Sequence, residues 1–145
     1  MRVVSVAESE YPELVELWEA SVRATHDFLT EKDIQFFKPL ILNQYLHAVE
    51  LRCVRGVSGG ILGFIGVADG NIEMLFVSPQ SRGKGVGSTL TKYAIKKLGV
   101  TSVDVNEQNP AAKGFYEHMG FKVSSRSPVD NTGRPYPILH LKLPG

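Results

Sequence analysis

The residues best suited to chemistry in this sequence lie in a glycine-rich segment, Gln80–Gly87, which follows a β-rich apolar run. Arg82 and Lys84 stand among its glycines, and helical spacing of apolar residues begins directly after it. A helix N-terminus carries unpaired N–H groups and a partial positive charge, and glycines let a ligand approach the backbone closely. The segment is therefore predicted to bind a phosphate or pyrophosphate, with the two cations as further donors.

Two common phosphate-binding loops do not fit this segment. The loop of nucleotide hydrolases needs G-x-x-x-x-G-K-[ST], and no such frame surrounds Lys84. The dinucleotide fingerprint needs G-x-G-x-x-G, whereas Ser88 fills the last glycine position of the frame that begins at Gly83. The pattern that does fit is Q-x-x-G-x-G, from Gln80 to Gly85. A glycine turn that only caps the helix is the alternative interpretation.

A second motif begins at Asn109 and runs to Tyr116, with Gly120-Phe121 after it. Together the two motifs resemble the GCN5-related N-acetyltransferase (GNAT) family. The coenzyme A loop of that family reads Q/R-x-x-G-x-G/A after a V-x-P strand end, and a later N-x-x-A-x-x-x-Y motif is followed by G-F. The segments Val77–Gly85 and Asn109–Tyr116 match these patterns at the expected separation, which makes the match much more specific than either motif alone.

A finer resemblance is to the bacterial YjaB-type acetyltransferases of the same family. It rests on Thr25–Leu29 and on the tail from Arg126 to Pro137. The resemblance covers nearly the whole chain and implies a single N-acetyltransferase domain over residues 1–145. It also implies that acetyl-CoA is the cofactor, that no metal takes part, and that an acetyl group passes to a primary amine by direct attack in a ternary complex.

Acetylation of an amine needs a proton donor for the departing thiolate, and Tyr116 is the candidate. A phenol with a pKa of ~10 can protonate a thiolate whose pKa is ~8–9. In the resembled family the tyrosine at this motif position lies near the coenzyme A sulfur. The alternative is that the Tyr116 ring packs in the core and its hydroxyl only makes a hydrogen bond.

The amine must also lose a proton, and Glu73 is the candidate base. An acidic residue at about this strand position is a frequent base in the resembled family. Strand alternation predicts that Glu73 shares a face with Leu75 and Val77, opposite Ile72, Met74 and Phe76. A solvated strand carboxylate is the alternative for Glu73, and a water chain is the alternative route for the proton.

The cofactor contacts implied by the resemblance cover the strand end, the loop and the second motif. Backbone groups at the strand end are expected to meet the pantetheine arm where two strands splay apart. Asn109 is expected to contact the cofactor and can also cap a helix that begins at Pro110. The full set is Leu75, Phe76, Val77, Gln80, Arg82, Gly83, Lys84, Gly85, Val86, Gly87, Ser88, Asn106, Asn109, Ala112 and Tyr116.

The acceptor side is expected where the first helix ends and in the proline-flanked tail. The residues assigned to it are His26, Asp27, Phe28 and Tyr136, with Arg134 beside them. A surface histidine at a helix end is the alternative for His26. The acceptor stays open between a protein lysine, an N-terminal amine, a polyamine and a small metabolite, although the YjaB-type resemblance favours a protein lysine. A non-catalytic acyl-CoA-binding sensor is the alternative function.

The elements that must position these residues follow from the periodicity. Helices are expected near Ser9–Thr25, from Thr30 with a break at Pro39, over Gly85–Leu98 and from Pro110. The order β-α-α-β-β-β-α-β-α-β-β predicts an α+β fold. Its mixed, mostly antiparallel sheet should have six to seven strands, about four flanking helices and a parallel crossover around Gly85–Leu98.

The composition restricts partners and compartment. The chain has 145 residues and a net charge of +1, so no overall field attracts nucleic acid or a membrane, and a toxin that acts on charged tRNA is disfavoured. Cys53 is the only cysteine and the four histidines lack metal-ligand spacing, so no metal site is expected. Without an apolar signal segment at Met1, a cytoplasmic protein is expected. The oligomeric state stays open between a monomer and a homodimer.

Overall fold

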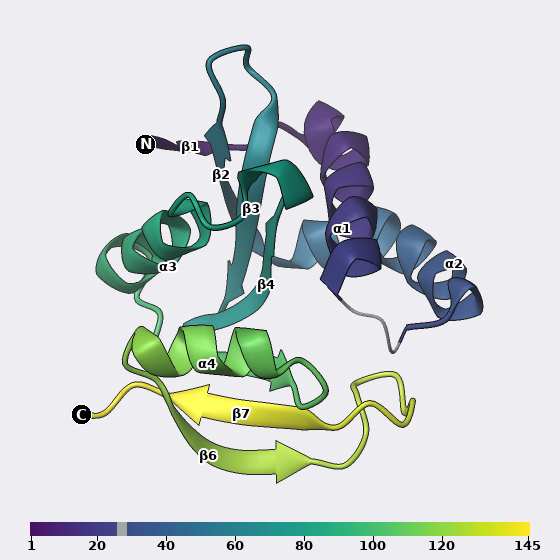
Figure 1. Cartoon of the computed structure of the whole chain (residues 1–145), viewed down its shortest axis with the longest axis vertical. Coiled ribbons are helices and arrows are strands. Elements are labelled where there is room, and N and C mark those ends of the chain that lie inside the picture. Colours follow the sequence, from purple (N-terminus) through teal and green to yellow (C-terminus); the bar gives the residue numbers. More distant parts are fainter. Residues whose placement is uncertain (26–28) are drawn as a thin grey trace.

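A computed structural model gives the structure and describes residues 1–25 and 29–145 (Figure 1). The strands and helices follow the expected order. They are β1 (Val3–Ser5), α1 (Tyr11–Thr25), α2 (Glu31–Leu40), β2 (Glu50–Arg55), β3 (Ile61–Ala68), β4 (Asn71–Val77), α3 (Val86–Lys97), β5 (Ser102–Asn106), α4 (Pro110–His118), β6 (Lys122–Ser127) and β7 (Ile138–Lys142).

The seven strands form one sheet in the order β1-β2-β3-β4-β5-β7-β6. Every neighbouring pair is antiparallel except β4 and β5, which are parallel and are connected through α3. A parallel pair needs such a crossover, whereas antiparallel strands can be joined by short turns. The predicted fold class, a mixed and mostly antiparallel sheet with four flanking helices, is confirmed.

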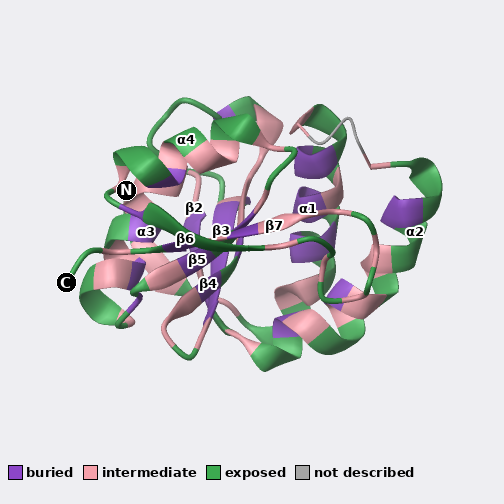
Figure 2. Cartoon of the chain, turned by 90° about the horizontal axis from the view of Figure 1, so that it is seen from below, coloured by how far each residue is buried: buried purple, intermediate pink, exposed green. Residues whose placement is uncertain are grey.

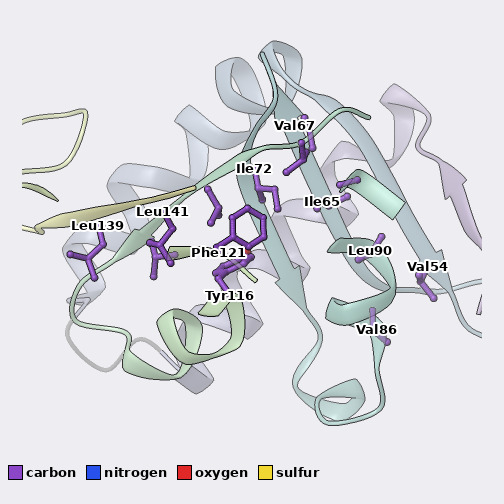
Figure 3. Packing of buried hydrophobic residues seen from close by; sticks show 14 residues of the cluster. Val54, Ile65, Val67, Ile72, Val86, Leu90, Tyr116, Phe121, Leu139 and Leu141 are labelled. Carbon is purple, nitrogen blue, oxygen red and sulfur yellow. The ribbon is translucent and has the colours of Figure 1, made fainter. Parts of the chain in front are cut away.

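The two faces of the sheet carry separate apolar clusters. One cluster joins β3, β4, β5 and β7 to α3 and α4, with Leu90, Tyr116 and Phe121 among its members (Figure 3). The other joins the opposite face to α1 and α2, and contains Leu14, Trp18 and Phe64. Figure 2 shows the buried residues along the central strands and on the inner sides of the helices, whereas β6 is exposed. The helix pairs therefore cover opposite faces of the sheet.

Two helix starts differ in how closely they follow the sequence signals. Thr30 caps α2 as expected, because its side chain accepts a hydrogen bond from the Asp33 N–H while the Asp33 side chain accepts from the Thr30 N–H. The first helix is expected to begin near Ser9, but α1 begins at Tyr11. A short 3₁₀ turn, Glu8–Glu10, precedes that helix, and the Glu10 carboxylate accepts from the backbone N–H of Ala7.

The second helix also shows the effect of its internal proline. Pro39 lies inside α2, and the regular α-helix ends one residue later, at Leu40. A π-helical turn, Ile41–Tyr45, follows directly. Proline removes one N–H from the hydrogen-bond ladder, so the break expected at this point occurs just after Pro39.

A β-bulge in β4 overturns the predicted orientation of Glu73. Gly66 pairs with Met74 and Val67 pairs with Ile72, so Glu73 is an extra residue without a partner in β3. A bulge of this kind reverses the alternation of side chains beyond it. Ile72 therefore packs with Leu75 and Val77 in the α3 and α4 cluster, and Glu73 lies with Met74 and Phe76 on the opposite face. The expected grouping of Glu73 with Leu75 and Val77 is wrong.

Among residues 1–25 and 29–145, none of the helices has both the length and the apolar composition that a membrane crossing requires.

Candidate active-site clefts

The parallel strands β4 and β5 separate soon after they meet. Their register contains only two pairs, Asn71 with Ser102 and Ile72 with Val103. Beyond this point β5 continues along β7, while β4 continues along β3. The segment Leu75–Val77 therefore has a backbone edge that faces the gap instead of a strand, which is the splayed edge expected from the sequence. Such an edge can pair with amide groups of an extended ligand.

A cleft of about 340 Å³ occupies this gap. It lies between the end of β4, the glycine-rich loop, the start of α3 and one side of α4, and the end of α1 closes it. Its lining residues are Ser21, Thr25, Leu75, Phe76, Val77, Ser81, Arg82, Gly83, Gly85, Val86, Gly87, Ser88, Asn109, Ala111, Ala112, Phe115 and Tyr116. The two sequence motifs thus meet around one cavity, which we call the donor cleft.

Two glycines shape the loop at the start of α3. Gly83 and Gly85 have φ values of 76° and 86°, a left-handed conformation that other residues rarely adopt. Gly85 is also the N-cap of α3 and offers no side-chain cap, so the first amides of this 12-residue helix are left for a ligand. Gly63 in β3 lets the helix begin close to the sheet, because a Cβ there would lie 2.7 Å from the Val86 Cγ1 atom.

The charged residues of the loop are available to an anion. Arg82 and Lys84 are exposed, and neither forms an ion pair within the part of the chain that the structure describes. Arg82 lines the donor cleft, but Lys84 and Gln80 do not. Ser81, which the motif treats as a variable position, is buried and does line it. The sequence held no signal for this serine.

The three fixed residues of the second motif all line the donor cleft, as do Ala111 and Phe115. Asn109 caps the helix, and its side-chain oxygen accepts from the Ala112 N–H at 3.1 Å. Asn109, Ala112 and Tyr116 all line the cleft, since spacings of three and four residues place them on one side of a helix. Capping and ligand contact by Asn109 are therefore compatible, as the sequence suggested.

Tyr116 is buried, with 6% of its surface exposed, and its ring packs edge-to-face on Phe121 (Figure 3) and on Phe115. Burial raises the pKa of its phenol above the ordinary value, because the charged phenolate would lose its hydration. The hydroxyl therefore stays protonated at neutral pH. Within the described residues it has no hydrogen-bond partner, so it can donate to a ligand in the cleft.

The last turn of α1 contributes two donor-cleft residues that sequence reasoning did not assign to the site. Ser21 and Thr25 lie one helical turn apart, and the Thr25 hydroxyl donates to the Ser21 carbonyl oxygen at 2.8 Å. Ser21 is buried although it is polar. A polar residue inside the apolar stripe of α1 was the one signal that could have indicated this.

A second cleft lies on the face of the sheet that α1 and α2 cover, and we call it the acceptor cleft. Its lining residues are Trp18, Val22, Leu29, Phe37, Ile41, Tyr45, Glu73, Met74, Phe76, Asn106, Asp130, Tyr136 and Ile138. Phe76 lines both clefts, so the two cavities meet at this residue of β4. Asn106, expected among the cofactor contacts, lines the acceptor cleft instead, and its side-chain oxygen accepts from the Gln108 N–H.

Glu73 carries the charge best placed to accept a proton in the acceptor cleft. Partial burial raises the pKa of its carboxyl group above the ordinary value. The negative charges of Asp104 and Asp69 act in the same direction, whereas a hydrogen bond from Asn71 opposes them. A carboxylate with a raised pKa is a stronger base than an ordinary glutamate, so the bulge places a suitable base beside the cleft.

The tail is fastened to α2 through Asp33, a buried carboxylate. Arg134 Nη1 lies 3.0 Å from Asp33 Oδ1, and the Tyr136 hydroxyl donates to Asp33 Oδ2. The Arg134 guanidinium also stacks on the Phe36 ring, 3.9 Å from its centroid. The hydrogen bond to Asp33 raises the pKa of Tyr136 to about 12. Tyr136 thus stays uncharged and is held as a wall of the acceptor cleft.

Three of the residues assigned to the acceptor, His26, Asp27 and Phe28, lie outside the described residues. The described chain ends before them at Thr25, which lines the donor cleft, and resumes at Leu29, which lines the acceptor cleft.

Comparisons with known proteins agree with this geometry. A family model described as "Acetyltransferase (GNAT) domain" matches residues 27–136. The peptidyl-lysine N-acetyltransferase YjaB of Escherichia coli is 37% identical, over 99% of each chain. The solution structure of apo YjaB from that organism superposes with a TM-score of 0.88 at 35% identity, covering 99% of this chain and 97% of the other. The N-acetyltransferase PaiA of Thermoplasma acidophilum, solved with coenzyme A, shares the fold with a TM-score of 0.72 at 20% identity, over 99% and 98% of the chains.

Proposed function

Because the chain belongs to the GNAT family of acetyltransferases, we propose that it transfers the acetyl group of acetyl-CoA to the side-chain amine of a protein lysine. The observation that carries the proposal is the meeting of the donor and acceptor clefts at Phe76. A direct transfer needs two ligands that approach one point from different sides. Phe76 lies in the part of β4 that no longer pairs with β5, so both clefts border the splayed stretch of this strand.

The residues of the donor cleft fit coenzyme A. The amides at the start of α3, together with Arg82, suit a pyrophosphate, and the free edge of Leu75–Val77 suits the amide groups of a pantetheine arm. The side chains of Asn109 and Ala112 bound the opposite wall. When bound, acetyl-CoA supplies a thioester whose sulfur leaves as a thiolate.

The chain's own side chains supply the proton transfers. Glu73 removes a proton from the ammonium group of the acceptor, since only the neutral amine has a free electron pair. The amine nitrogen then attacks the acetyl carbon directly as the carbon–sulfur bond breaks. Tyr116 donates its phenolic proton to the departing sulfur, and the second proton, which the nitrogen loses as the amide forms, returns to the Tyr116 oxygen and restores the phenol. Each role rests on the placement of the residue in one of the two clefts.

A lysine side chain fits the acceptor cleft chemically. Trp18, Phe37 and Tyr45 offer apolar surface to its hydrocarbon stem, while Glu73 and Asp130 are complementary to its charge. The relatives named for peptidyl-lysine acetylation support the same acceptor. Cys53 is a buried free thiol, which suits a reducing compartment, and we propose a cytoplasmic location on this ground.

The decisive experiment offers the protein acetyl-CoA with a peptide that has a blocked N-terminus and a single lysine. Thiol release and a mass increase of one acetyl group on the lysine are expected. The matched control peptide carries arginine in place of the lysine, and spermidine serves as a non-peptide amine. Acetylation of spermidine without acetylation of the peptide would replace the protein acceptor by a polyamine. Binding of acetyl-CoA without transfer to any amine would support the sensor function instead.

A further inference from the structure

The exposed face of the sheet next to the acceptor cleft carries three side chains with a known catalytic geometry. Ser127 lies at the end of β6, His140 in the middle of β7 and Asp104 in the middle of β5. Ile138 and Asn106, which line the acceptor cleft, lie two residues from His140 and Asp104 on the same strands. Residues two apart share a face, so the cluster is the next row of side chains outside that cleft.

The distances within the cluster are those of a serine activated by a histidine. Ser127 Oγ lies 2.7 Å from His140 Nε2, and His140 Nδ1 lies 2.6 Å from Asp104 Oδ1. A carboxylate can only accept, so Nδ1 carries the ring proton and Nε2 is left to accept the proton of Ser127. This is the chain of hydrogen bonds that lets serine act as a nucleophile, and it recurs on unrelated folds.

The carboxylate of the cluster is held from its other side as well. Asn71 Nδ2 donates to Asp104 Oδ2 at 3.2 Å, and the Ser102 hydroxyl donates to Asn71 Oδ1 at 2.7 Å. Both oxygens of Asp104 are therefore engaged, one by the histidine and one by the amide. A side chain fixed in this way orients the imidazole that it contacts.

A second β-bulge brings the serine to the histidine. Val123 pairs with Leu141, and Ser125 pairs with His140, so Ser124 is an extra residue in β6. Without the bulge, Ser125 and Ser127 would continue on the face of Val123. With it, they point to the face of His140, and Ser127 lies diagonally across from it.

We propose that Ser127 is a nucleophile that takes the acyl group of small activated carboxylic esters and releases it to water. The side chains of His140 and Asp104 are 34% and 37% exposed, and β6 is an edge strand, so a small ester can reach the hydroxyl. The proposal concerns ester hydrolysis without acetyl-CoA, and it stands independently of the amine acetylation proposed above.

The reaction proceeds in two balanced steps. In the first, Ser127 Oγ bonds to the acyl carbon while its proton passes to His140 Nε2; the ester carbon–oxygen bond breaks, and the alcohol leaves with that proton. In the second, water attacks the acyl-serine, His140 accepts a proton from the water, and the serine oxygen departs with it. The products are an alcohol and a carboxylic acid.

The test uses 4-nitrophenyl acetate, because 4-nitrophenol is a good leaving group. The full chain, without acetyl-CoA, should release 4-nitrophenol faster than buffer alone. The peptide that contains Ser127 should gain one acetyl group in a mass spectrum of enzyme quenched during turnover. Ser127→Ala and His140→Ala should each lower the rate above background at least tenfold, since general-base assistance contributes roughly 10²–10⁴-fold.

Ser125→Ala is the matched control, because Ser125 occupies the same strand and face but makes no hydrogen bond to the His140 ring within the described residues. It should retain the wild-type rate. Circular dichroism of each variant excludes a loss of folding. An unchanged rate in folded Ser127→Ala, or acetylation found only on lysines, would overturn the proposal.

Discussion

Tyr116 and Glu73 show how burial changes the chemistry of a side chain. Burial raises the pKa of both groups, so each holds a proton more strongly than it would in water. The phenol becomes harder to ionise and stays a proton donor. The carboxylate becomes a better proton acceptor at the same time as it keeps contact with solvent. The two residues line different clefts that share Phe76, so the proposed acid and the proposed base are separated in space.

Replacing Tyr116 by phenylalanine should lower kcat and leave the affinity for acetyl-CoA nearly unchanged. The ring contacts with Phe115 and Phe121 persist in the variant, so only the proton donor is lost. A reduction of about 10²-fold is expected, at the lower end of general-acid effects. Steady-state kinetics measure the change in kcat, and titration with acetyl-CoA measures the affinity. Tyr93→Phe is the control, because Tyr93 lines neither cleft. Full activity of Tyr116→Phe would remove this residue as the acid.

Glu73→Gln should remove the acid limb of the pH profile of kcat/KM. The raised pKa means that protonation of Glu73, and with it loss of the base, begins at a higher pH than for an ordinary glutamate of pKa ~4.3. The variant should be slower above this limb and should lack it. Glu117→Gln, on the exposed side of α4, is the control and should keep the wild-type profile. A profile of Glu73→Gln with the limb intact would show that another group accepts the proton.

At the scale of elements, the loop before α3 and the tail docked on α2 form the two ends of the site. The loop conformation follows from glycines that tolerate positive φ, and its charges come from neighbouring positions in the chain. The tail depends on Asp33, which lies about a hundred residues earlier, as shown by the sequence separation of 101 to Arg134. The loop end of the site therefore depends on residues that are neighbours in the sequence, whereas the tail end depends on a contact between distant segments.

Gly83→Ala should weaken acetyl-CoA binding. A Cβ at this position meets nothing within 4 Å, so the cost comes from the φ of 76° and is roughly 1–2 kcal/mol. The loop avoids this cost by changing conformation, which raises the Kd measured by calorimetry. Gly114→Ala is the matched control, since Gly114 lies in α4 with no left-handed φ and also has open space around it. It should bind normally and gain about 0.5–1 kcal/mol of stability. Equal Kd values for both variants would contradict the role of the loop.

Asp33→Ala should raise the KM for the acceptor and leave that for acetyl-CoA unchanged. The variant frees Tyr136 and leaves Arg134 without its partner, so the free energy of unfolding should fall by about 3 kcal/mol. Chemical denaturation and steady-state kinetics measure these changes. Lys32→Ala, at the exposed neighbouring position, is the control. A rise in the KM for acetyl-CoA alone would contradict the placement of the tail at the acceptor cleft.

The pH dependence of this stability has a definite sign. Hydrogen bonding, above all from Tyr136, lowers the pKa of Asp33 in the folded protein. The stabilisation is therefore present above the unfolded pKa of ~3.9 and disappears as the pH falls through the lower folded value. The difference in the free energy of unfolding between the wild type and Asp33→Ala should therefore become smaller below about pH 4.

At the scale of the whole molecule, one continuous sheet joins the two apolar clusters. Adjacent residues of β3, Phe64 and Ile65, are both fully buried, and they belong to opposite clusters. The same strands contribute side chains to both clusters, so loss of packing on one face would also disturb the strands on which the other cluster is built. This coupling is the physical basis for expecting residues 1–145 to behave as a single domain.

Thermal unfolding should therefore be a single transition, and acetyl-CoA should raise its midpoint temperature equally for every probe. Trp18, the only tryptophan, reports on the α1 side, and far-ultraviolet circular dichroism reports on all elements. The two midpoints should coincide, and ligand at 100 times its Kd should add about 2.7 kcal/mol of stability. Separate midpoints, or a shift in only one signal, would contradict a single cooperative unit.

The amino-acid sequence by itself determined the local parts of this protein. The loop at Gln80–Gly87 could be recognised because its glycines, cations and following helix are contiguous. The same is true of Asn109, whose cap depends on the next three residues, and of the capping box at Thr30. Short-range hydrogen bonds and backbone preferences decide such features, so residue types and spacing are sufficient to predict them.

The tertiary structure alone decided which side chains meet. Glu73 and Ser127 point to faces that simple alternation does not predict, because each lies at or beyond a bulge set by the register of the neighbouring strand. Asn106 was assigned to the donor cleft and lies in the acceptor cleft, since β5 leaves β4 before reaching it. A single extra residue reverses a strand's alternation, and its position depends on hydrogen bonds to a distant segment. For this reason the sequence could predict that the two motifs lie together around one cleft, whereas the full lining of the acceptor cleft and the serine–histidine–aspartate cluster required the fold.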